Sequence, residues 1–417
     1  MTTRTGMQAL IPLSLALAFV GGLSAMAETV GPVTDELGVV EVPAGEPLQI
    51  GSYLALTGPD AALGIDARRG IEIALEDYGG DVLGHPVQIT YEDEGCSAEG
   101  GQTAATRLAS NPEIVGILGS SCSSAARAGA PILWQQKIAS VGVGPTAPSL
   151  TAPDRAPGFE GFIRVSFNDN NTGNFAADYA YNALKLKTIA TIHDGGPYAQ
   201  QLVNVFGNRF EELGGEITAS EAVAPTDTDM RPVLTRIGTN KPDGIFAPLY
   251  IPAGGYMLRQ LAEVPSLEGT TFLSADPIMA PAFLSAAGQS AIGIKMVGID
   301  FRPEALGPKY GAFVETYKSK YGESPIAGFH AYGYDAFGVL VAAIEKVAVK
   351  DNDGNLYVGR GALNDALHVT SGYEGLTGKL GCNEVGDCAS PIYAVWEYTS
   401  EDPASYRLGT NPIRIYP

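Results

Sequence analysis

The sequence predicts an α/β protein with two lobes, each built on a doubly wound parallel sheet. The chain has 417 residues, and at roughly 100 to 200 residues per domain two domains are expected. Short apolar runs alternate with amphipathic segments, a pattern typical of parallel strands connected by helices. This alternation occurs twice, on either side of a Pro/Gly-rich connection over residues 145–158. A closed barrel of eight such units would give the same periodicity, so on the pattern alone a barrel remains an alternative to two lobes.

The composition indicates a globular protein that does not bind nucleic acid. Apolar residues make up 45% of the chain and charged residues 17%, which excludes a disordered polypeptide. With 26 Lys and Arg against 46 Asp and Glu, the formal net charge is -20. Nucleic-acid binding needs clustered Lys and Arg to replace counterions along the phosphates, and the sequence has no such cluster.

Residues 1–27 have the features of an export signal. Arg4 precedes an apolar stretch over residues 9–20, and Ala25-Met26-Ala27 has the small-x-small pattern that signal peptidase cleaves. We expect cleavage after Ala27 and a periplasmic location, with an uncleaved anchor as the alternative. No Cys lies near this site, so we expect no lipid anchor.

The first run of elements is expected to begin at Leu48, after a Pro/Gly/acid-rich lead-in over residues 28–47. Residues 48–54 form an apolar run that predicts a buried strand. Ile71, Ala74, Leu75 and Tyr78 then fall at helical spacing before a Gly-Gly stop. The same reasoning predicts the remaining elements of this lobe, which are strands over 86–91, 114–118 and 138–141 and helices over 102–110 and 125–136.

A second run of the same kind follows the Pro/Gly-rich connection. Its strands are expected over residues 188–192, 217–219, 244–249 and 271–274, with helices that start near Ala199, Met230 and Gly255. Residues 303–349 have a helical pattern. Residues 373–397 predict hairpin-like strands around a cysteine-bounded loop.

The four cysteines are expected to form two disulfides. Exported compartments are oxidising, and the most economical pairing joins Cys96 to Cys122 and Cys382 to Cys388. A metal site is the alternative. It is disfavoured because the two-residue spacings of zinc sites and nearby histidines are both lacking.

The sequence contains no motif that indicates catalysis. It lacks a nucleophile elbow, a zinc-protease helix motif, a phosphate-binding loop and a complete dinucleotide fingerprint. His193-Asp194 at a strand end is either an acid/base or metal pair or a polar loop. Asp351, Asp353 and Asn355 resemble the start of a calcium loop, but Gly354 stands at the fourth position instead of the sixth, which favours a surface turn. We therefore expect no enzyme activity, metal or cofactor.

Two loops at strand ends are rich in glycine and small hydroxyl residues. They cover residues 119–124 and 142–146. Ligands of open α/β sheets bind outside the carboxyl ends of the strands, where helix N-termini favour anions, so a carboxylate is the expected ligand group. The alternative is that Ser123 and Ser124 are ordinary N-caps of the following helix.

These segments resemble the leucine/isoleucine/valine-binding proteins of ABC transporters, which have the type I periplasmic binding fold. The resemblance extends from about Leu48 to Trp396, in the order and close to the spacing of that family. It is carried by Leu56-Thr57-Gly58-Pro59, Tyr91-Glu92-Asp93 before Cys96, residues 119–124, Pro145-Thr146-Ala147-Pro148, Ile192-His193-Asp194 with Tyr198, and Met257-Leu258-Arg259-Gln260.

The resemblance implies a two-lobed clamp joined by a three-strand hinge, which closes over an amino acid. The crossings are expected near residues 165–166, 297–300 and 390–393. Lobe 1 would then comprise residues 48–166 with 299–390, and lobe 2 residues 167–298 with 391–417. A monomer that delivers its ligand to ABC transporter permease subunits is expected.

The resemblance also implies roles for individual residues. Ser123 would bind the ligand carboxylate, and Thr146 would hold both carboxylate and ammonium. The carbonyl of Pro145 and the carboxylate of Asp276 would receive the ammonium. Tyr198 and Tyr250 would line the cleft.

Two positions depart from the family and reshape the expected pocket. Leu63 stands where many relatives have an aromatic residue, and Asp276 is one methylene shorter than the usual Glu. A methylene in a pocket is worth about 1 to 3 kcal/mol, so the preference among aliphatic amino acids can shift. Phe329 is expected near the side-chain end of the cleft.

Three functions remain open on the sequence. The first is a receptor for a branched-chain or related amino acid. The second keeps the fold but binds an aromatic carboxylate, a short amide or urea. In that case Asp276 would face the cleft without an ammonium to pair with, which is unfavourable. The third is an exported enzyme or ligand sensor.

Overall fold

The computed structural model describes residues 1–3 and 27–417. Most of the predicted export signal, residues 4–26, lies outside the described residues, and so do Ala25 and Met26 of its cleavage motif. Within the ranges that are described, no helix is both long and apolar enough to cross a bilayer.

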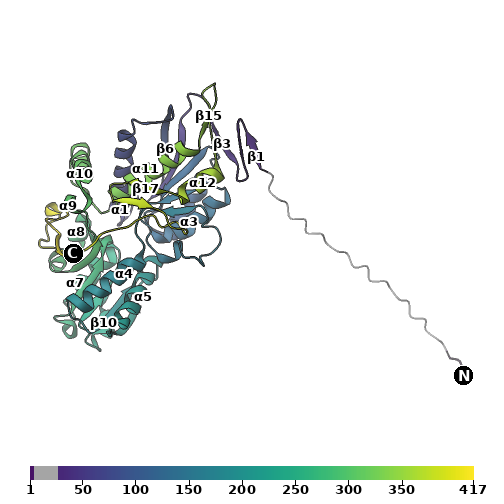
Figure 1. Cartoon of the computed structure of the whole chain (residues 1–417). Coiled ribbons are helices and arrows are strands. Elements are labelled where there is room, and N and C mark those ends of the chain that lie inside the picture. Colours follow the sequence, from purple (N-terminus) through teal and green to yellow (C-terminus); the bar gives the residue numbers. More distant parts are fainter. Residues whose placement is uncertain (4–26) are drawn as a thin grey trace.

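Lobe 1 is built on a six-stranded sheet in the order β5-β6-β4-β7-β8-β9. In Figure 1 it is the lobe that carries the labels β6, α1, α11 and α12. All neighbouring strands are parallel except the short β5, which pairs antiparallel with β6. The strands are β4 (Leu48–Leu54), β5 (Asp81–Val82), β6 (His85–Asp93), β7 (Ile114–Gly119), β8 (Ser140–Gly142) and β9 (Phe162–Arg164).

Helices cover both faces of this sheet. Leu54 on β4 packs in the cluster that includes α1 and α11, and its neighbour Tyr53 packs with α2 and α3, because successive strand residues point to opposite faces. The helices of lobe 1 are α1 (Ala61–Asp77), α2 (Ala98–Ala109), α3 (Ser123–Gln135), α9 (Pro303–Leu306), α10 (Pro308–Tyr321), α11 (His330–Val347) and α12 (Arg360–His368).

Lobe 2 is built on a seven-stranded sheet in the order β11-β10-β12-β13-β14-β19-β20. The first five strands are parallel. β19 and β20 extend the sheet, and each pairs antiparallel with the strand before it in this order. The strands are β10 (Thr188–His193), β11 (Glu216–Ala222), β12 (Gly244–Phe246), β13 (Thr271–Ala275), β14 (Lys295–Ile299), β19 (Tyr393–Glu397) and β20 (Ile413–Tyr416). The helices are α4 (Asp169–Asp178), α5 (Pro197–Glu212), α6 (Arg231–Gly238), α7 (Ile251–Leu261) and α8 (Pro281–Ala287).

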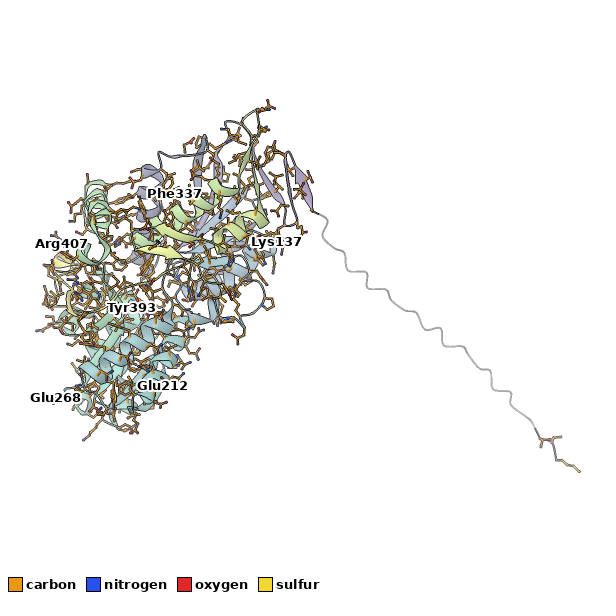
Figure 2. The ribbon with its side chains drawn as sticks, in the orientation of Figure 1. Lys137, Glu212, Glu268, Phe337, Tyr393 and Arg407 are labelled. Carbon is orange, nitrogen blue, oxygen red and sulfur yellow. A yellow bond between two sulfur atoms is a disulfide. The ribbon has the colours of Figure 1, made fainter. Side chains whose placement is uncertain are left out.

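The chain passes between the two sheets after β9, after β14 and before β19. Tyr393, at the start of β19, lies where the two lobes meet (Figure 2). Its ring stacks on Phe175 of α4 at 5.4 Å between centroids and meets Phe167 edge-on at 5.9 Å. Two separate open sheets connected in this way confirm the predicted α/β fold class and exclude the closed barrel.

The lead-in is more structured than predicted. Residues 28–35 form a hairpin of β1 (Glu28–Val30) and β2 (Val33–Asp35). β3 (Val39–Val42) joins β15 (Val349–Lys350) and β16 (Leu356–Gly359) in a small sheet. Val42 pairs with Leu356, a partner more than 300 positions away along the chain, which local periodicity does not reveal.

Several element boundaries also differ from the prediction. β12 ends at Phe246, and α7 begins at Ile251 with Pro252 in its first turn, because Pro suits a first helical turn that leaves N–H groups unpaired. The predicted hairpin over residues 373–397 divides: β17 (Ser371–Glu374) pairs with β18 (Lys379–Gly381), whereas β19 joins the sheet of lobe 2.

Both predicted disulfides are confirmed. Cys96 is bonded to Cys122, and Cys382 to Cys388. The Asp351 segment is the surface turn of the β15–β16 hairpin, since the Asp351 carboxylate accepts hydrogen bonds from the backbone of Asp353 and Asn355.

Helices α1 and α11 approach closely because glycines lie at their contact. A Cβ on Gly70 would lie 1.8 Å from the carbonyl oxygen of His330, and a Cβ on Gly333 would lie 2.1 Å from that of Ala67. Only residues without a Cβ permit this backbone approach.

We predict that Gly70→Ala lowers the melting temperature, because overpacking against a backbone atom costs about 1 to 3 kcal/mol. Calorimetric unfolding measures this. Gly207→Ala in α5 is the matched control, since its Cβ would meet nothing closer than 3.6 Å and alanine favours a helix by about 1 kcal/mol. Equal destabilisation by both variants would contradict the close-contact explanation.

Candidate functional site

A small cavity lies between the facing edges of the two sheets. It is narrow, with a volume of about 10 Å³, and both lobes contribute to its wall. The lining residues are Leu63, Ser121, Gly144, Thr146 and Phe329 from lobe 1 and Tyr198, Tyr250, Asp276 and Pro277 from lobe 2. Larger grooves exist on the outer surface, such as one over Leu258 and Ile292, but none of these lining residues belongs to it.

The wall is formed largely by loops and helix starts that follow parallel strands. Ser121 follows β7, Thr146 follows β8, Tyr250 follows β12 and Asp276 follows β13. The carboxyl ends of parallel strands lie at one edge of a sheet, which is where open α/β sheets bind ligands. Six of the eight predicted binding residues thus lie around one cavity.

The lobe 2 side of the cavity has two buried acidic groups, Asp276 and the nearby Asp169, and no basic side chain on the wall is available to pair with them. No Lys, Arg or His is among the residues lining the cavity in the described part of the chain. Burial, together with the nearby Asp169 carboxylate, raises the pKa of Asp276 to about 8. Burial also raises the pKa of Asp169 to about 7, against the opposing effect of its hydrogen bond from Thr146.

Polar atoms without partners mark the same region. Asp169 accepts a hydrogen bond from the Thr146 hydroxyl through Oδ2 at 2.7 Å, but its buried Oδ1 has no partner among the described residues. The buried Tyr198 hydroxyl likewise has none. Buried polar atoms in folded proteins are rarely left unpaired, so such atoms indicate a place that a ligand or water completes.

Ser123, at the first turn of α3, is not among the residues that line the cavity, to which the preceding loop contributes Ser121. Ser123 is the first residue of this helix, and its Oγ accepts hydrogen bonds from the backbone N–H groups of Thr146 and Ala147, each at 3.1 Å. Its hydroxyl proton remains available to donate. Cys122 is the N-cap and makes no side-chain cap bond, so the N-cap alternative for Ser123 and Ser124 is wrong.

The Glu94 carboxylate accepts hydrogen bonds from two backbone N–H groups of the loop before α3. Its Oε1 accepts from the N–H groups of Ser121 and Cys122 at 3.0 Å each, and burial raises its pKa well above the usual range. Ser121 itself lines the cavity. The prediction from sequence included Ser121 in the serine-rich loop but did not single it out as a lining residue.

Pro145 does not line the cavity. Its carbonyl accepts hydrogen bonds from Arg164 Nη1 at 3.1 Å and Ser166 Oγ at 3.2 Å. The fully buried Arg164 also donates to Asp387 at 2.6 Å. Arg164 thus fixes the loop before Thr146, and protein donors already bond the carbonyl that was expected to receive an ammonium.

Apolar side chains form the remaining end of the cavity. Leu63 comes from α1, and Phe329 comes from the loop before α11. A Cβ on Gly144 would lie 2.2 Å from the Phe329 ring, so glycine allows the ring to pack flat against this loop. Tyr198 and Tyr250 pack together across the cavity wall with 5.3 Å between ring centroids.

The lobes contact each other on either side of the cavity. The Asp60 carboxylate of lobe 1 accepts a hydrogen bond from the N–H of Ile251 in lobe 2 at 3.2 Å. Ser149 and Gln201 exchange two hydrogen bonds at 2.8 and 2.9 Å. These contacts hold the lobes together over the cavity.

His193 and Asp194 form a polar loop. His193 Nδ1 accepts from the N–H of Gly195, and Asp194 Oδ1 accepts from that of Gly196. Across the described ranges, no group of three or more His, Cys, Asp or Glu side chains is arranged to hold a metal ion.

We predict that the ligand-free protein loses stability as the pH rises from about 4 to about 8. Asp169 and Asp276 have raised pKa values in the folded protein, so the folded state binds more protons than the unfolded state in this window. Melting temperatures across this range should fall more gently for Asp276→Asn than for the wild type. Asp178→Asn, at a half-buried position on α4 that pairs with Arg209 away from the cavity, should keep the full slope of melting temperature against pH, and a wild-type slope in Asp276→Asn would contradict the account.

Comparisons with known proteins agree with this architecture. A family model described as a periplasmic binding protein matches residues 47–390. The Leu/Ile/Val-binding protein homolog 3 of Brucella melitensis is 25% identical over 356 residues, which cover 84% of this chain and 91% of that protein.

Solved structures give the same result. A leucine-binding protein of Thermotoga maritima has a TM-score of 0.76 at 28% identity, covering 85% of this chain and 96% of that one. A solute-binding protein of an ABC transporter from R. palustris, in complex with benzoate, has a TM-score of 0.71 at 20% identity and covers 89% and 96% of the two chains. The latter likeness concerns the fold alone. The chain therefore belongs to the periplasmic binding protein family and is a distant homologue of the Leu/Ile/Val-binding proteins, which are non-enzymatic binding proteins.

Proposed function

We propose that this protein is the periplasmic receptor of an ABC importer and binds an aliphatic α-amino acid in the cavity between its lobes. The observation that carries this proposal is the carboxylate of Asp276, which lines a cavity whose wall has no basic side chain. A buried charge without a partner costs several kcal/mol. An ammonium group on the ligand supplies that partner.

The ligand carboxylate would bind at the start of α3. The first N–H groups of this 13-residue helix and the positive end of its dipole would then face the carboxylate. The hydroxyl of Ser123 would donate to the carboxylate, with Ser121 on the adjoining wall. Thr146 would lie between the two charged groups of the ligand. Its hydroxyl donates to Asp169, so its oxygen could accept from the ammonium.

The ligand side chain would lie against Leu63 and Phe329. Both are almost fully buried apolar side chains, which favour an apolar ligand side chain. The cavity volume of about 10 Å³ is room for roughly one water molecule, so the lobes would have to move apart to admit an amino acid. Tyr198 and Tyr250 would close the cavity from lobe 2.

Release and delivery would follow from hinge motion between the lobes. We infer that lobe 1 comprises residues 48–166 with 299–390, and lobe 2 residues 167–298 with 391–417. The Asp60–Ile251 and Ser149–Gln201 bonds would then form only when the lobes close. The closed receptor would be the species that docks on the permease subunits of the transporter.

An aromatic carboxylate is the second candidate. Three aromatic rings, of Tyr198, Tyr250 and Phe329, line the cavity, and the R. palustris protein of the same fold was crystallised with benzoate. Such a ligand has no ammonium. It would require Asp276 to stay protonated beside a second carboxylate, so the two candidates differ in their dependence on Asp276.

We predict that Asp276→Asn weakens leucine binding by about 100-fold or more, because removing one partner of a buried ion pair costs about 3 to 5 kcal/mol. Isothermal calorimetry on protein freed of ligand by unfolding and refolding measures this. Binding of benzoate, where detectable, should be unchanged or tighter. Asp178→Asn is the control and should bind leucine as the wild type does. Equal losses for leucine and benzoate in Asp276→Asn would overturn the assigned role.

A further inference from the structure

A second buried carboxylate, Asp66, lies behind the cavity and accepts hydrogen bonds from five donors. Its side chain has no solvent exposure. Oδ1 accepts from the N–H of Ile326 at 3.1 Å and the hydroxyl of Tyr317 at 2.8 Å. Oδ2 accepts from the N–H groups of Phe329 and His330 at 2.9 and 2.8 Å. His330 Nδ1 is the fifth donor at 2.8 Å. A carboxylate has about four lone-pair sites, so this one is saturated.

These bonds join two segments that are far apart in sequence. Asp66 belongs to α1, whereas residues 326–330 form the loop that leads into α11. The ring of His330 continues the network, because its Nδ1 faces the acceptors Asp66 and Ala327 and its Nε2 contacts the Tyr310 hydroxyl at 2.9 Å. The loop is therefore held along its length by one side chain of α1.

The same contact is reinforced by the close approach of the two helices. Gly70 lies against the carbonyl of His330, and Gly333 lies against that of Ala67. The backbones cannot come closer, and the Asp66 carboxylate prevents the loop from moving away. The position of this loop relative to α1 is thereby fixed in both directions.

The positions of Leu63 and Phe329, the two apolar residues at one end of the cavity, depend on the hydrogen bonds of Asp66. Leu63 is one helical turn before Asp66 on α1, where residues three apart share a face. Phe329 donates its backbone N–H to Asp66. One carboxylate therefore sets the separation between the two side chains that the ligand side chain would contact.

We propose that Asp66 is a positioning residue that determines which side-chain lengths the cavity accepts. The proposal rests on the proposed function, since it concerns the side-chain end of the same cavity. Asp66 acts through Leu63 and Phe329 and does not line the cavity itself. Weakening the hydrogen bonds to Asp66 is expected to reduce discrimination among ligands with different side chains. It is expected to have a smaller effect on the binding of the carboxylate and ammonium groups that these ligands share.

The test compares Asp66→Asn with a matched control, Asp335→Asn. Asp335 is also fully buried, lies on α11, and accepts hydrogen bonds from the backbone of Leu376 and Thr377 and the hydroxyl of Thr377. It makes no contact with the loop that carries Phe329 in any of these bonds. Both variants lose a buried hydrogen-bond acceptor, so both should melt at a lower temperature.

Calorimetric dissociation constants for alanine, valine, leucine and methionine then separate the two roles. We expect the spread of affinities across this series to shrink by about tenfold in Asp66→Asn, because each methylene is discriminated by about 10-fold or more in an intact pocket. Asp335→Asn should keep the wild-type ratios within about twofold. Equal changes for all four ligands in Asp66→Asn, or the same loss of discrimination in Asp335→Asn, would overturn the proposal.

Two further measurements keep the proposal falsifiable. Should Asp66→Asn not fold, Tyr317→Phe removes one of the five donors and should shift the ratios in the same direction by about threefold; unchanged ratios would count against Asp66. Should the wild type bind none of the four amino acids, the proposed function fails separately. Crystal structures of the ligand-free variants then decide, and a Phe329 ring unmoved against Leu63 in Asp66→Asn would overturn the positioning role.

Discussion

The binding cavity depends on one electrostatic constraint, which is a carboxylate in a desolvated space whose wall has no basic side chain. Burial and the neighbouring Asp169 raise the pKa of Asp276 to about 8, and the lining residues offer it no cation. This arrangement is unfavourable for the protein alone. The unpaired Asp169 Oδ1 and Tyr198 hydroxyl add to this cost. A cationic ligand relieves it, so the same residues that destabilise the ligand-free cavity give selectivity for an ammonium group.

Buried polar side chains just outside the cavity hold the loops of this site in place. Arg164 bonds the carbonyls that flank Thr146, and Asp387, from the Cys382–Cys388 loop, pairs with that guanidinium. Glu94 fixes the loop before α3, and Asp66 fixes the loop that carries Phe329. Each of these side chains joins segments far apart in sequence, so the shape of the cavity is a property of the packed lobes as a whole.

Sequence patterns predicted what is local and missed what depends on distant partners. The alternation of strands and helices and both disulfides were recovered, because apolar periodicity and cysteine spacing are local signals. The pairing of Val42 with Leu356 and the insertion of β19 into lobe 2 were missed, since neither leaves a local pattern. The same limit applies to the site. The sequence assigned the Pro145 carbonyl to an ammonium and did not single out Asp66, and only the fold shows that Arg164 bonds the first and that the second holds Phe329.

The number of protons exchanged on ligand binding tests the central claim most directly. Near pH 7, Asp276 is largely protonated in the ligand-free protein, and pairing with an ammonium requires it to ionise. Titrations of leucine in buffers with different ionisation enthalpies should therefore show release of about one proton per ligand bound. Leucine binding without proton release, or tight binding of a plain carboxylate with proton uptake while leucine does not bind, would contradict the role of Asp276 as the ammonium partner.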